Sequence, residues 1–248
     1  MLRSSKSLTG YKIHAKDGEI GKISEFFFDD ENWTIRYVVV DTGTWLPGRK
    51  VLLSPLFAIS KPDWKSKTFP VDLTKEQVKN SPDVALDKPV SRQHEIELSK
   101  YYGWRPYWSP GVIAGAHPVI PVTPQTEQEK GDAAEEKGDP HLRSTREVTG
   151  YNIHAADGEI GHVEEFIIDD ESWIIRYLVV DTRNWLPGRK VVVSPAWVKK
   201  VSWGDEMVDI DLSRESIKDS PEYDPSAPIN QQYEMRLYDF YGRPKYWL

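Results

Sequence analysis

The sequence predicts a mainly β protein made of two copies of one small fold, each ending in a short helix and an aromatic arm. Three observations lead to this prediction. Residues 3–55 and 143–195 align at a fixed offset of 140, and 35 of these 53 positions are identical. Closely spaced turn residues divide each copy into short apolar strands. Similar aromatic runs, Tyr107-Trp108 and Tyr246-Trp247, then follow a helical pattern near the end of each copy.

The repeat sets the expected domain organisation. Weaker similarity continues to Tyr102-Gly103 and Tyr241-Gly242, now at an offset of 139. A repeat of this length is a whole domain, because solenoid units have ~20–50 residues. We therefore predict domains at residues 1–109 and 141–248. Residues 110–140 are rich in proline at first and then polar and acidic, which predicts a flexible linker.

Within the first copy, turn residues separate a series of short strands. The expected strands cover residues 11–15, 19–29, 34–41, 49–54, 58–64 and 68–73. Asp17-Gly18 is a strong hairpin signal, and Leu46-Pro47-Gly48 indicates a further turn. Val38-Val39-Val40 is apolar on both faces, as is typical of a central strand. Six short strands with tight turns favour a small barrel or sandwich.

Two helices are expected after these strands in each copy. Thr74 and Gln77 have the spacing of a capping box, and the helix that they begin should end before Ser81-Pro82. Farther on, apolar and aromatic residues recur at i, i+4, i+7 and i+8, which places them on one helix face before Gly103 or Gly242. That face needs a cover, which is its own barrel, the other copy or a partner.

Composition excludes several classes of function. The chain has no cysteine, so disulfides, thiolate catalysis and cysteine metal sites are excluded. No apolar run approaches the ~18 residues of a membrane span, and no secretory signal is evident, so we expect a cytoplasmic protein without an integral membrane segment. The net charge of −7 argues against nucleic acid as a partner.

The charge is unevenly distributed along the chain. Residues 1–110 carry +3, residues 111–140 carry −4 and residues 141–248 carry −6. Two copies that are closely similar in sequence therefore differ in the sign of their charge. This difference is either neutral surface drift or a feature that helps the two copies to pair.

One stretch of each copy resembles the PRC-barrel domain, a module shared by the photosynthetic reaction-centre H subunit and a ribosome maturation factor. The resemblance covers roughly residues 3–75 and 143–214, and the aromatic tails are similar to those of bacterial members. The matching positions in the first copy are Gly10, Asp17-Gly18, Ile20-Gly21, Ile23, Asp29-Asp30 and Tyr37–Asp41. Those in the second copy are Gly150, Asp157-Gly158, Ile160-Gly161, Val163, Asp169-Asp170 and Tyr177–Asp181.

The resemblance implies two small PRC-like β-barrels that bind other proteins and have no known catalytic centre. The membrane helix of the H subunit and the separate N-terminal domain of the maturation factor have no counterpart in this sequence. Photosynthetic and ribosomal roles are therefore not carried over to this chain.

Few residues are candidates for chemistry. His14 and His154 lie near carboxylates, and the acidic turns at Asp29–Glu31 and Asp169–Glu171 offer oxygen ligands of the kind that Ca²⁺ and Mg²⁺ prefer. The turns lack the spacing of a dedicated calcium loop, and no phosphate loop, nucleophile elbow or dinucleotide motif is present. We expect no catalytic, cofactor or metal site. A module that senses a divalent metal or small ligand is an alternative, as is an enzyme with its site between the barrels.

Candidate partner-binding residues lie in one repeated loop and in the aromatic arms, because tryptophan and arginine dominate interface hot spots. They are Trp45, Leu46, Arg49, Trp185, Leu186, Arg189, Tyr107, Trp108, Tyr246 and Trp247. Alternatively, the loop folds back and plugs the end of the barrel. The expected function is a non-enzymatic protein-interaction adaptor or scaffold. Its barrels would pair as an intramolecular pseudo-dimer, or two chains would exchange their arms in a homodimer.

Overall fold

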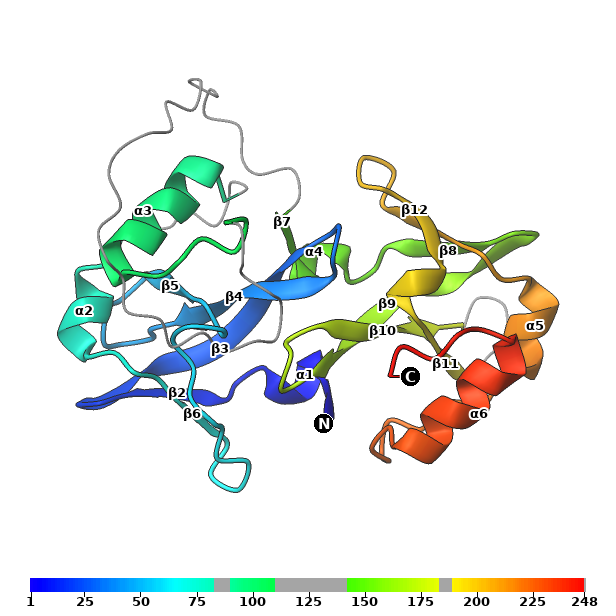
Figure 1. The fold of residues 1–248 in the computed structure, drawn as a ribbon, viewed down its shortest axis with the longest axis horizontal. Helices are drawn as coiled ribbons and strands as arrows, with labels where there is room; N and C mark the ends of the chain where they lie inside the picture. Colours follow the sequence, from blue (N-terminus) through cyan, green and yellow to red (C-terminus); the bar gives the residue numbers. More distant parts are fainter. Residues whose placement is uncertain (83–89, 110–141, 183–188, 248) are drawn as a thin grey trace. The chain divides into compact units, whose positions relative to one another are not determined.

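A computed structural model describes residues 1–82, 90–109, 142–182 and 189–247 (Figure 1). The predicted linker, residues 110–140, lies wholly outside these residues. The described chain is mainly β, as predicted, and has two sheets. It forms two compact units: residues Thr9–Ser144, called the first unit, and residues Met1–Leu8 with Thr145–Leu248, called the second unit.

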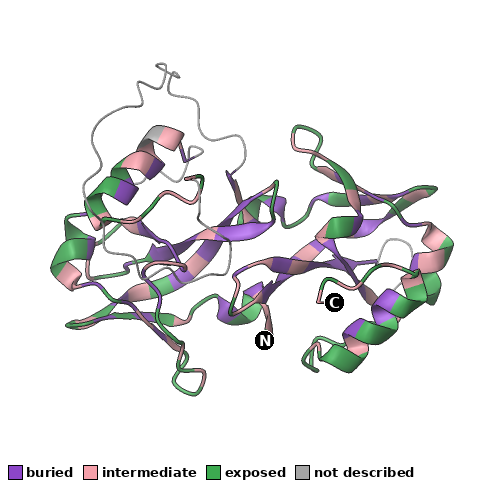
Figure 2. Ribbon diagram, viewed as in Figure 1, coloured by how far each residue is buried: buried purple, intermediate pink, exposed green. Residues whose placement is uncertain are grey.

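The first unit contains a six-stranded sheet. Its strands are β2 (Lys12–Ala15), β3 (Gly18–Asp29), β4 (Thr34–Asp41), β5 (Lys50–Leu53), β6 (Thr68–Pro70) and β7 (Leu142–Ser144). The order is β5-β4-β3-β2-β6, with β7 also paired to β3. Strands β2 and β3 form the hairpin predicted from Asp17-Gly18, and β4 is central, with Val38–Val40 fully buried (Figure 2).

The second unit contains the equivalent sheet with one more strand. Its strands are β1 (Leu2–Ser4), β8 (Asn152–Ala155), β9 (Gly158–Asp169), β10 (Ile175–Asp181), β11 (Lys190–Val193), β12 (Val198–Ser202) and β13 (Met207–Ile210). The order is β11-β10-β9-β8-β13-β12, with β1 also paired to β9. A 3-10 turn at Pro195–Trp197 precedes β12.

Neither strand order closes into a ring among the described residues, so the predicted barrel closure is not observed. In the first unit, the strand expected at 58–64 is reduced to two isolated bridges, Ile59↔Val71 and Asp63↔Thr68. Pro62 interrupts this segment, and proline cannot donate to a ladder. The second unit has β12 at the corresponding position, where it pairs with β13.

The first strand of each repeat lies in the sheet of the other repeat, which the sequence analysis did not anticipate. Strand β1 pairs antiparallel with β9, with Ser4 opposite Ile167. Strand β7 pairs antiparallel with β3, with Ser144 opposite Phe27. The short helices α1 (Ser5–Leu8) and α4 (Thr145–Val148) that follow these strands both belong to the second unit. The compact units thus differ from the predicted domains 1–109 and 141–248 by this exchange of strands.

Helix α2 (Lys75–Lys79) begins at its predicted capping box, and the two C-terminal helices end at their predicted glycines. The capping box of Thr74 and Gln77 is complete, and α5 (Arg214–Asp219) is capped by Ser213. Helices α3 (Arg92–Tyr102) and α6 (Gln231–Tyr241) end at Gly103 and Gly242, which have the left-handed conformation that favours glycine. No helix in the described ranges is long and apolar enough to cross a membrane.

Each C-terminal helix covers the sheet of its own repeat. Leu98 of α3 belongs to a buried cluster with Phe27, Tyr37 and Leu52 of the first unit, and Leu142 of β7 completes it. In the second unit, the ring of Tyr238 on α6 contacts Trp197 at 5.3 Å between centroids. Leu98 and Leu237 on the apolar helix faces are therefore buried within their own units, whereas Tyr101 and Phe240 stay 40% and 44% exposed.

Candidate interaction sites

Each exchanged strand is held by one arginine and one serine. Arg3 Nε on β1 donates to Asp170 Oδ2 at 2.9 Å, and the Ser4 hydroxyl donates to Glu165. Both acceptors belong to the second repeat. The strand is therefore recognised by its side chains as well as by its backbone.

The second exchanged strand repeats these contacts residue for residue. Arg143 Nε on β7 donates to Asp30 Oδ2 at 3.2 Å, and the Ser144 hydroxyl donates to Glu25. We call the segments Phe27–Asp30 and Ile167–Asp170, together with Glu25 and Glu165, the strand acceptors. The shared sequence Leu-Arg-Ser at 2–4 and 142–144 is thus bound by equivalent acidic residues in both units.

The acidic turns act in this recognition and in holding their own backbone. Asp29 Oδ1 accepts from the N–H of Glu31 at 2.9 Å, while its Oδ2 lies 2.8 Å from Arg36 Nη2. Burial raises the pKa of Asp29, but the hydrogen bond and charge of Arg36 outweigh it and hold the pKa below its ordinary value. Among the described residues, no group of three His, Asp or Glu side chains is placed to hold a metal ion.

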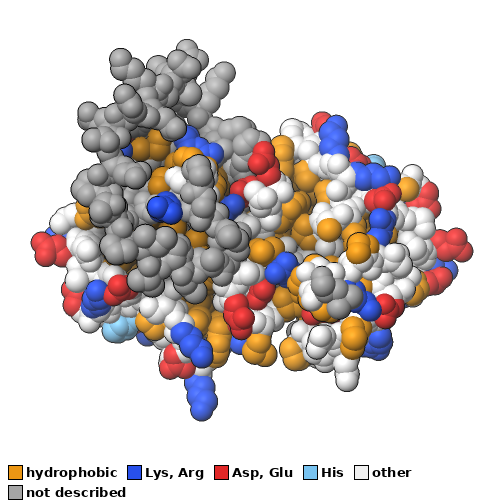
Figure 3. Space-filling model, in the orientation of Figure 1, with side chains coloured by type: hydrophobic (Ala, Val, Ile, Leu, Met, Phe, Trp, Pro, Cys, Tyr) orange, Lys and Arg blue, Asp and Glu red, His pale blue; other side chains and the backbone are white. Residues whose placement is uncertain are grey.

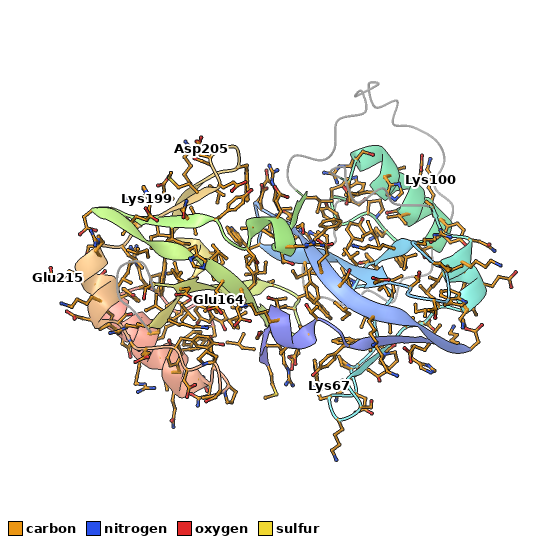
Figure 4. All side chains as sticks on the ribbon, turned by 180° about the vertical axis from the view of Figure 1, so that it is seen from behind. Lys67, Lys100, Glu164, Lys199, Asp205 and Glu215 are labelled. Atoms are coloured by element: carbon orange, nitrogen blue, oxygen red, sulfur yellow. The ribbon has the colours of Figure 1, made fainter. Side chains whose placement is uncertain are left out.

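The second acceptor has a charged contact that the first does not share. Glu164 on β9 accepts from Lys6 Nζ at 2.9 Å and lies 2.7 Å from Lys190 Nζ (Figure 4). Burial raises the pKa of Glu164, but its bonds to Lys190 and Lys6 lower it further, to below the ordinary value. The matching residue of the first repeat is Ser24, which has no charge. The two acceptors therefore differ at this position.

A groove of about 600 Å³ opens beside the predicted loop of the first unit. It is lined by Thr9-Gly10, Glu19–Ser24 and Asp41–Trp45. Trp45 is half-buried at one end, and Lys75 Nζ lies 4.8 Å from the centroid of its ring. Among the predicted loop residues, Trp45 lines this groove, whereas Trp185 and Leu186 lie outside the described residues.

The loop arginines have structural contacts. The Arg49 guanidinium donates to the carbonyl oxygens of Lys79 and Ser81, and Arg189 donates to that of Ser220. These carbonyls follow or end α2 and α5, where backbone acceptors lack partners within the helix. Leu46 is half-buried, and its carbonyl oxygen accepts from the Thr42 hydroxyl at 2.7 Å. These bonds fix the loop to the sheet, and a role of these side chains in binding a partner stays a prediction.

The aromatic arm of the first unit folds back onto arginines of its own unit. The guanidinium of Arg36 lies 4.1 Å from the ring centroid of Tyr107, and that of Arg92 lies 4.0 Å from the ring centroid of Trp108. Such cation–π contacts stabilise by about 0.5–2 kcal/mol each. Trp108 nevertheless stays 38% exposed, so one of its faces is available to solvent.

The aromatic arm of the second unit is held in a related way. The guanidinium of Arg176 lies 4.2 Å from the ring centroid of Tyr246, whose hydroxyl donates to Glu234 at 2.8 Å. Trp247 contacts the ring of Tyr238 at 5.2 Å between centroids. The predicted arm residues thus pack against their own units, and Tyr246 stays 42% exposed.

Sequence reasoning missed the residues that hold the exchanged strands and the buried glutamates Glu95 and Glu234. A signal for the strand contacts existed, because Arg3, Ser4, Glu25 and Asp30 all recur at the offset of 140. Identity at polar positions of this kind indicates contacts between side chains, but it does not show which copy supplies each partner.

Comparison with known proteins adds no family to this description. No protein-family model matches the chain, and no similar sequence is found among curated proteins. The PRC-barrel resemblance therefore stays an expectation drawn from the motifs.

Proposed function

We propose that the chain is a non-enzymatic scaffold for protein–protein interaction, in which the two repeats act together as a pseudo-dimer. The reciprocal exchange of β1 and β7 carries this proposal. Isologous pairing of two copies of one fold is the commonest form of oligomer, and a duplicated chain can provide both copies. The PRC-like barrel character implied by the motifs, and a cytoplasmic location, belong to the same proposal.

The exchanged strands support pairing because each completes a sheet edge and a core. Leu142 is 5% exposed in the cluster that contains Phe27 and Tyr37. Without β7, these residues would lose an apolar neighbour, and the backbone of β3 from Phe27 to Asp29 would lose one of its two partner strands. An uncovered edge favours aggregation, so neither repeat is complete without the other.

The groove beside Trp45 is our proposed docking surface for a protein partner. It joins a half-buried tryptophan to glycines and to polar and charged side chains, among them Lys22 and Asp41, a combination suited to a hot spot with a polar rim. Figure 3 shows acidic and basic side chains interspersed over the described surface in view. A partner would then be selected by shape and hydrogen bonding more than by one sign of charge.

Cleavage between the repeats tests the pairing. A protease site is placed in residues 110–141 of the full chain, and the folded protein is cut and applied to a sizing column at micromolar concentration. We expect the two pieces to elute together. A variant with R3A, S4A, R143A and S144A carries the same protease site. Its two pieces should bind each other more weakly, so they should separate at protein concentrations at which the wild-type pieces stay together. Two folded pieces that elute separately from the cut wild type would refute the proposal.

Affinity capture with matched variants tests the docking surface. The full chain, W45A and W108A are used to capture binding proteins from the same lysate. Because a hot-spot tryptophan contributes about 2 kcal/mol or more, W45A should lose a bound partner at least about tenfold. W108A is the control, since Trp108 is partly exposed but lies outside the groove. Equal capture by all three proteins would remove the groove from the proposal.

A further inference from the structure

The contacts that hold β1 do not depend on which chain supplies it. Leu, Arg and Ser occupy positions 2–4 and 142–144, and both acceptors present the same glutamate and aspartate. A strand from any copy of the chain therefore satisfies the same hydrogen bonds. Only the concentration of the donor strand near the acceptor differs between one chain and two.

We propose that the second strand acceptor, on β9, also binds β1 from a second copy of this chain, so that two chains form a closed dimer by exchanging repeats. The proposal rests on the pairing of repeats in the proposed function. It differs from an exchange of the aromatic arms, because α3 and α6 cover their own sheets. The occupant of the acceptor is residues 1–8 of the second chain.

The covalent order of the chain makes this exchange reciprocal. Leu8 belongs to the second unit and the next residue, Thr9, to the first, so only α1 separates β1 from the first unit. Ser144 and Thr145 form the same kind of junction for β7. When the β1 strand of one chain binds β9 of a second chain, the first unit that follows β1 is brought close to the second chain. Its β3 can then bind the β7 of that second chain. Two such exchanges use every donor and every acceptor, so assembly stops at the dimer.

The length of the connecting segment permits both arrangements. Residues 110–141 join the two repeats and would span on the order of 110 Å if fully extended. A connection of this kind gives an effective concentration in the millimolar range for pairing within one chain. The monomer is therefore favoured at micromolar concentration, and the dimer forms when unfolded chains refold together at high concentration.

The ion pair between Lys6 and Glu164 directs β1 to β9 instead of β3. Lys6 Nζ and Glu164 Oε1 are 2.9 Å apart, and the Glu164 side chain is 16% exposed. The equivalent residue of β3 is Ser24, which offers no charge to Lys6. The N-terminal repeat of one chain is thereby matched with the C-terminal repeat of the other. This matching gives the experiment a charge that can be reversed.

Charge reversal on separate full-length chains tests the exchange. In K6E, two carboxylates meet at this contact, and in E164K, two ammonium groups meet, whether β1 binds in the same chain or in an identical one. When K6E and E164K are unfolded and refolded together, exchange between the two variants places opposite charges at both contacts. The mixture should contain about tenfold more dimer than either variant refolded alone, as measured by light scattering on a sizing column.

The double variant K6E/E164K is the matched control. It restores opposite charges within one chain, while its substituted residue 164 still faces Lys190 as it does in E164K. It should return to the monomer under the conditions in which the mixture forms dimer. An equal dimer fraction in the mixture and in the separate variants would overturn the proposal.

A second measurement uses the unmodified protein and needs no variant to fold. Isotopically light and heavy chains are refolded together at high concentration, and a carbodiimide then links Lys6 to Glu164. The dimer fraction should contain light–heavy linked peptides and the monomer fraction none. A dimer without such peptides, or no dimer at all, overturns this inference. The proposed function fails separately, by dissociation of the pieces after cleavage between the repeats.

Discussion

The carboxylate buried beneath the C-terminal helix is balanced differently in the two repeats. Glu95 on α3 is completely buried, accepts from the Tyr37 hydroxyl at 3.0 Å and lies 3.3 Å from Arg92 Nη1. Glu234, at the matching position of α6, accepts from the hydroxyls of Tyr177 and Tyr246, both at 2.8 Å. The second repeat has Gln231 where the first has Arg92.

The difference shows that this site requires donors directed at the carboxylate, and that a cation is one of two ways to supply them. A buried carboxylate is costly unless it is paired or hydrogen-bonded. In the second unit, the aromatic arm supplies a donor through Tyr246. The arm tyrosine lies under an arginine guanidinium in both repeats, Tyr107 under Arg36 and Tyr246 under Arg176. The Tyr107 hydroxyl also accepts from Arg92 Nη1 at 3.4 Å, so in the first unit the arm contacts the cation that is paired with the carboxylate.

The largest effect is expected where the repeats do not differ. Gly21 and Gly161 have φ of +154° and +146°, and a Cβ at either would lie 2.1 or 1.9 Å from the carbonyl oxygen of Asp41 or Asp181. The atoms that the added Cβ would meet are backbone atoms of a neighbouring strand and cannot rotate away as a side chain could. G21A and G161A should therefore each lower the free energy of unfolding by about 3 kcal/mol or more. Urea denaturation measures this loss.

Gly204 provides the control for both glycine variants. A Cβ added at this glycine would have open space within 4 Å, and its φ is not positive, so G204A should stay within about 0.5 kcal/mol of the wild type. Equal losses in G21A and G161A would show that the close backbone approach of Gly21 to Asp41 is equivalent to that of Gly161 to Asp181. A loss in only one of them would contradict the close approach seen in the other.

The next largest effect separates the two carboxylates. E95Q removes the charge that attracts Arg92 and should destabilise α3 by about 2–3 kcal/mol. E234Q retains an amide oxygen for the two tyrosine hydroxyls and should destabilise α6 by about 1 kcal/mol. Hydrogen exchange of the two helices, read by mass spectrometry, compares these losses within one molecule. An equal or larger loss in E234Q would refute the distinction drawn between cation and hydroxyl donors.

Local signals made much of the fold predictable. The Asp17-Gly18 hairpin, the Thr74 capping box and the central strand at Val38–Val40 depend on neighbouring residues, and the structure contains all three. The strand expected at 58–64 was wrong for the first unit, because Pro62 interrupts the segment and only two isolated bridges form, although β6 lies at the position of β13. The counterpart β12 contains no proline and pairs with β13.

The strand exchange and the buried sites could not be predicted for a different reason. The sequence Leu-Arg-Ser occurs identically in both repeats, so it does not reveal whether it binds its own sheet or the other one. Tyr107 and Trp108 were expected to contact a partner, and their contacts with Arg36 and Arg92 depend on how a distant strand and helix fold. Of the loop candidates, Trp45 lines the groove, and its role in binding a partner stays a prediction.

A smaller effect on the arm is expected when the first repeat is given the residue of the second. R92Q removes the guanidinium that stacks on Trp108 and should lower the stability of the arm by about 1 kcal/mol. It also removes the cation paired with Glu95, which adds a separate loss in α3. Hydrogen exchange at residues 104–109 should then rise several-fold, with residues 243–247 unchanged. R236Q is the control, because the Arg236 guanidinium lies 5.9 Å from the ring of Tyr233 and belongs to the second unit. Unchanged exchange in R92Q would show that Arg36 alone holds the arm.

The smallest effect concerns the acid sensitivity of the turn that borders the first strand acceptor. Burial raises the pKa of Asp29, but Arg36 lowers it further, so the folded protein holds this carboxylate ionised more readily than the unfolded chain does. Its contribution is therefore complete above the unfolded pKa of about 4 and is lost as the pH falls through the lower pKa of the folded state. Allowing for partial solvent screening, that contribution is less than about 1 kcal/mol.

Stability measured between about pH 5 and pH 2.5 tests this sign. The wild type should lose more stability over this range than D29N, which has no carboxyl group to protonate at that position. D63N is the comparison, because the pKa of Asp63 is also lowered, but by hydrogen bonds from Ser66 and Lys65 in an exposed turn and not by an arginine. A D29N profile parallel to that of the wild type would mean that Arg36 stabilises the turn through packing against Tyr107 and not through the charge of Asp29.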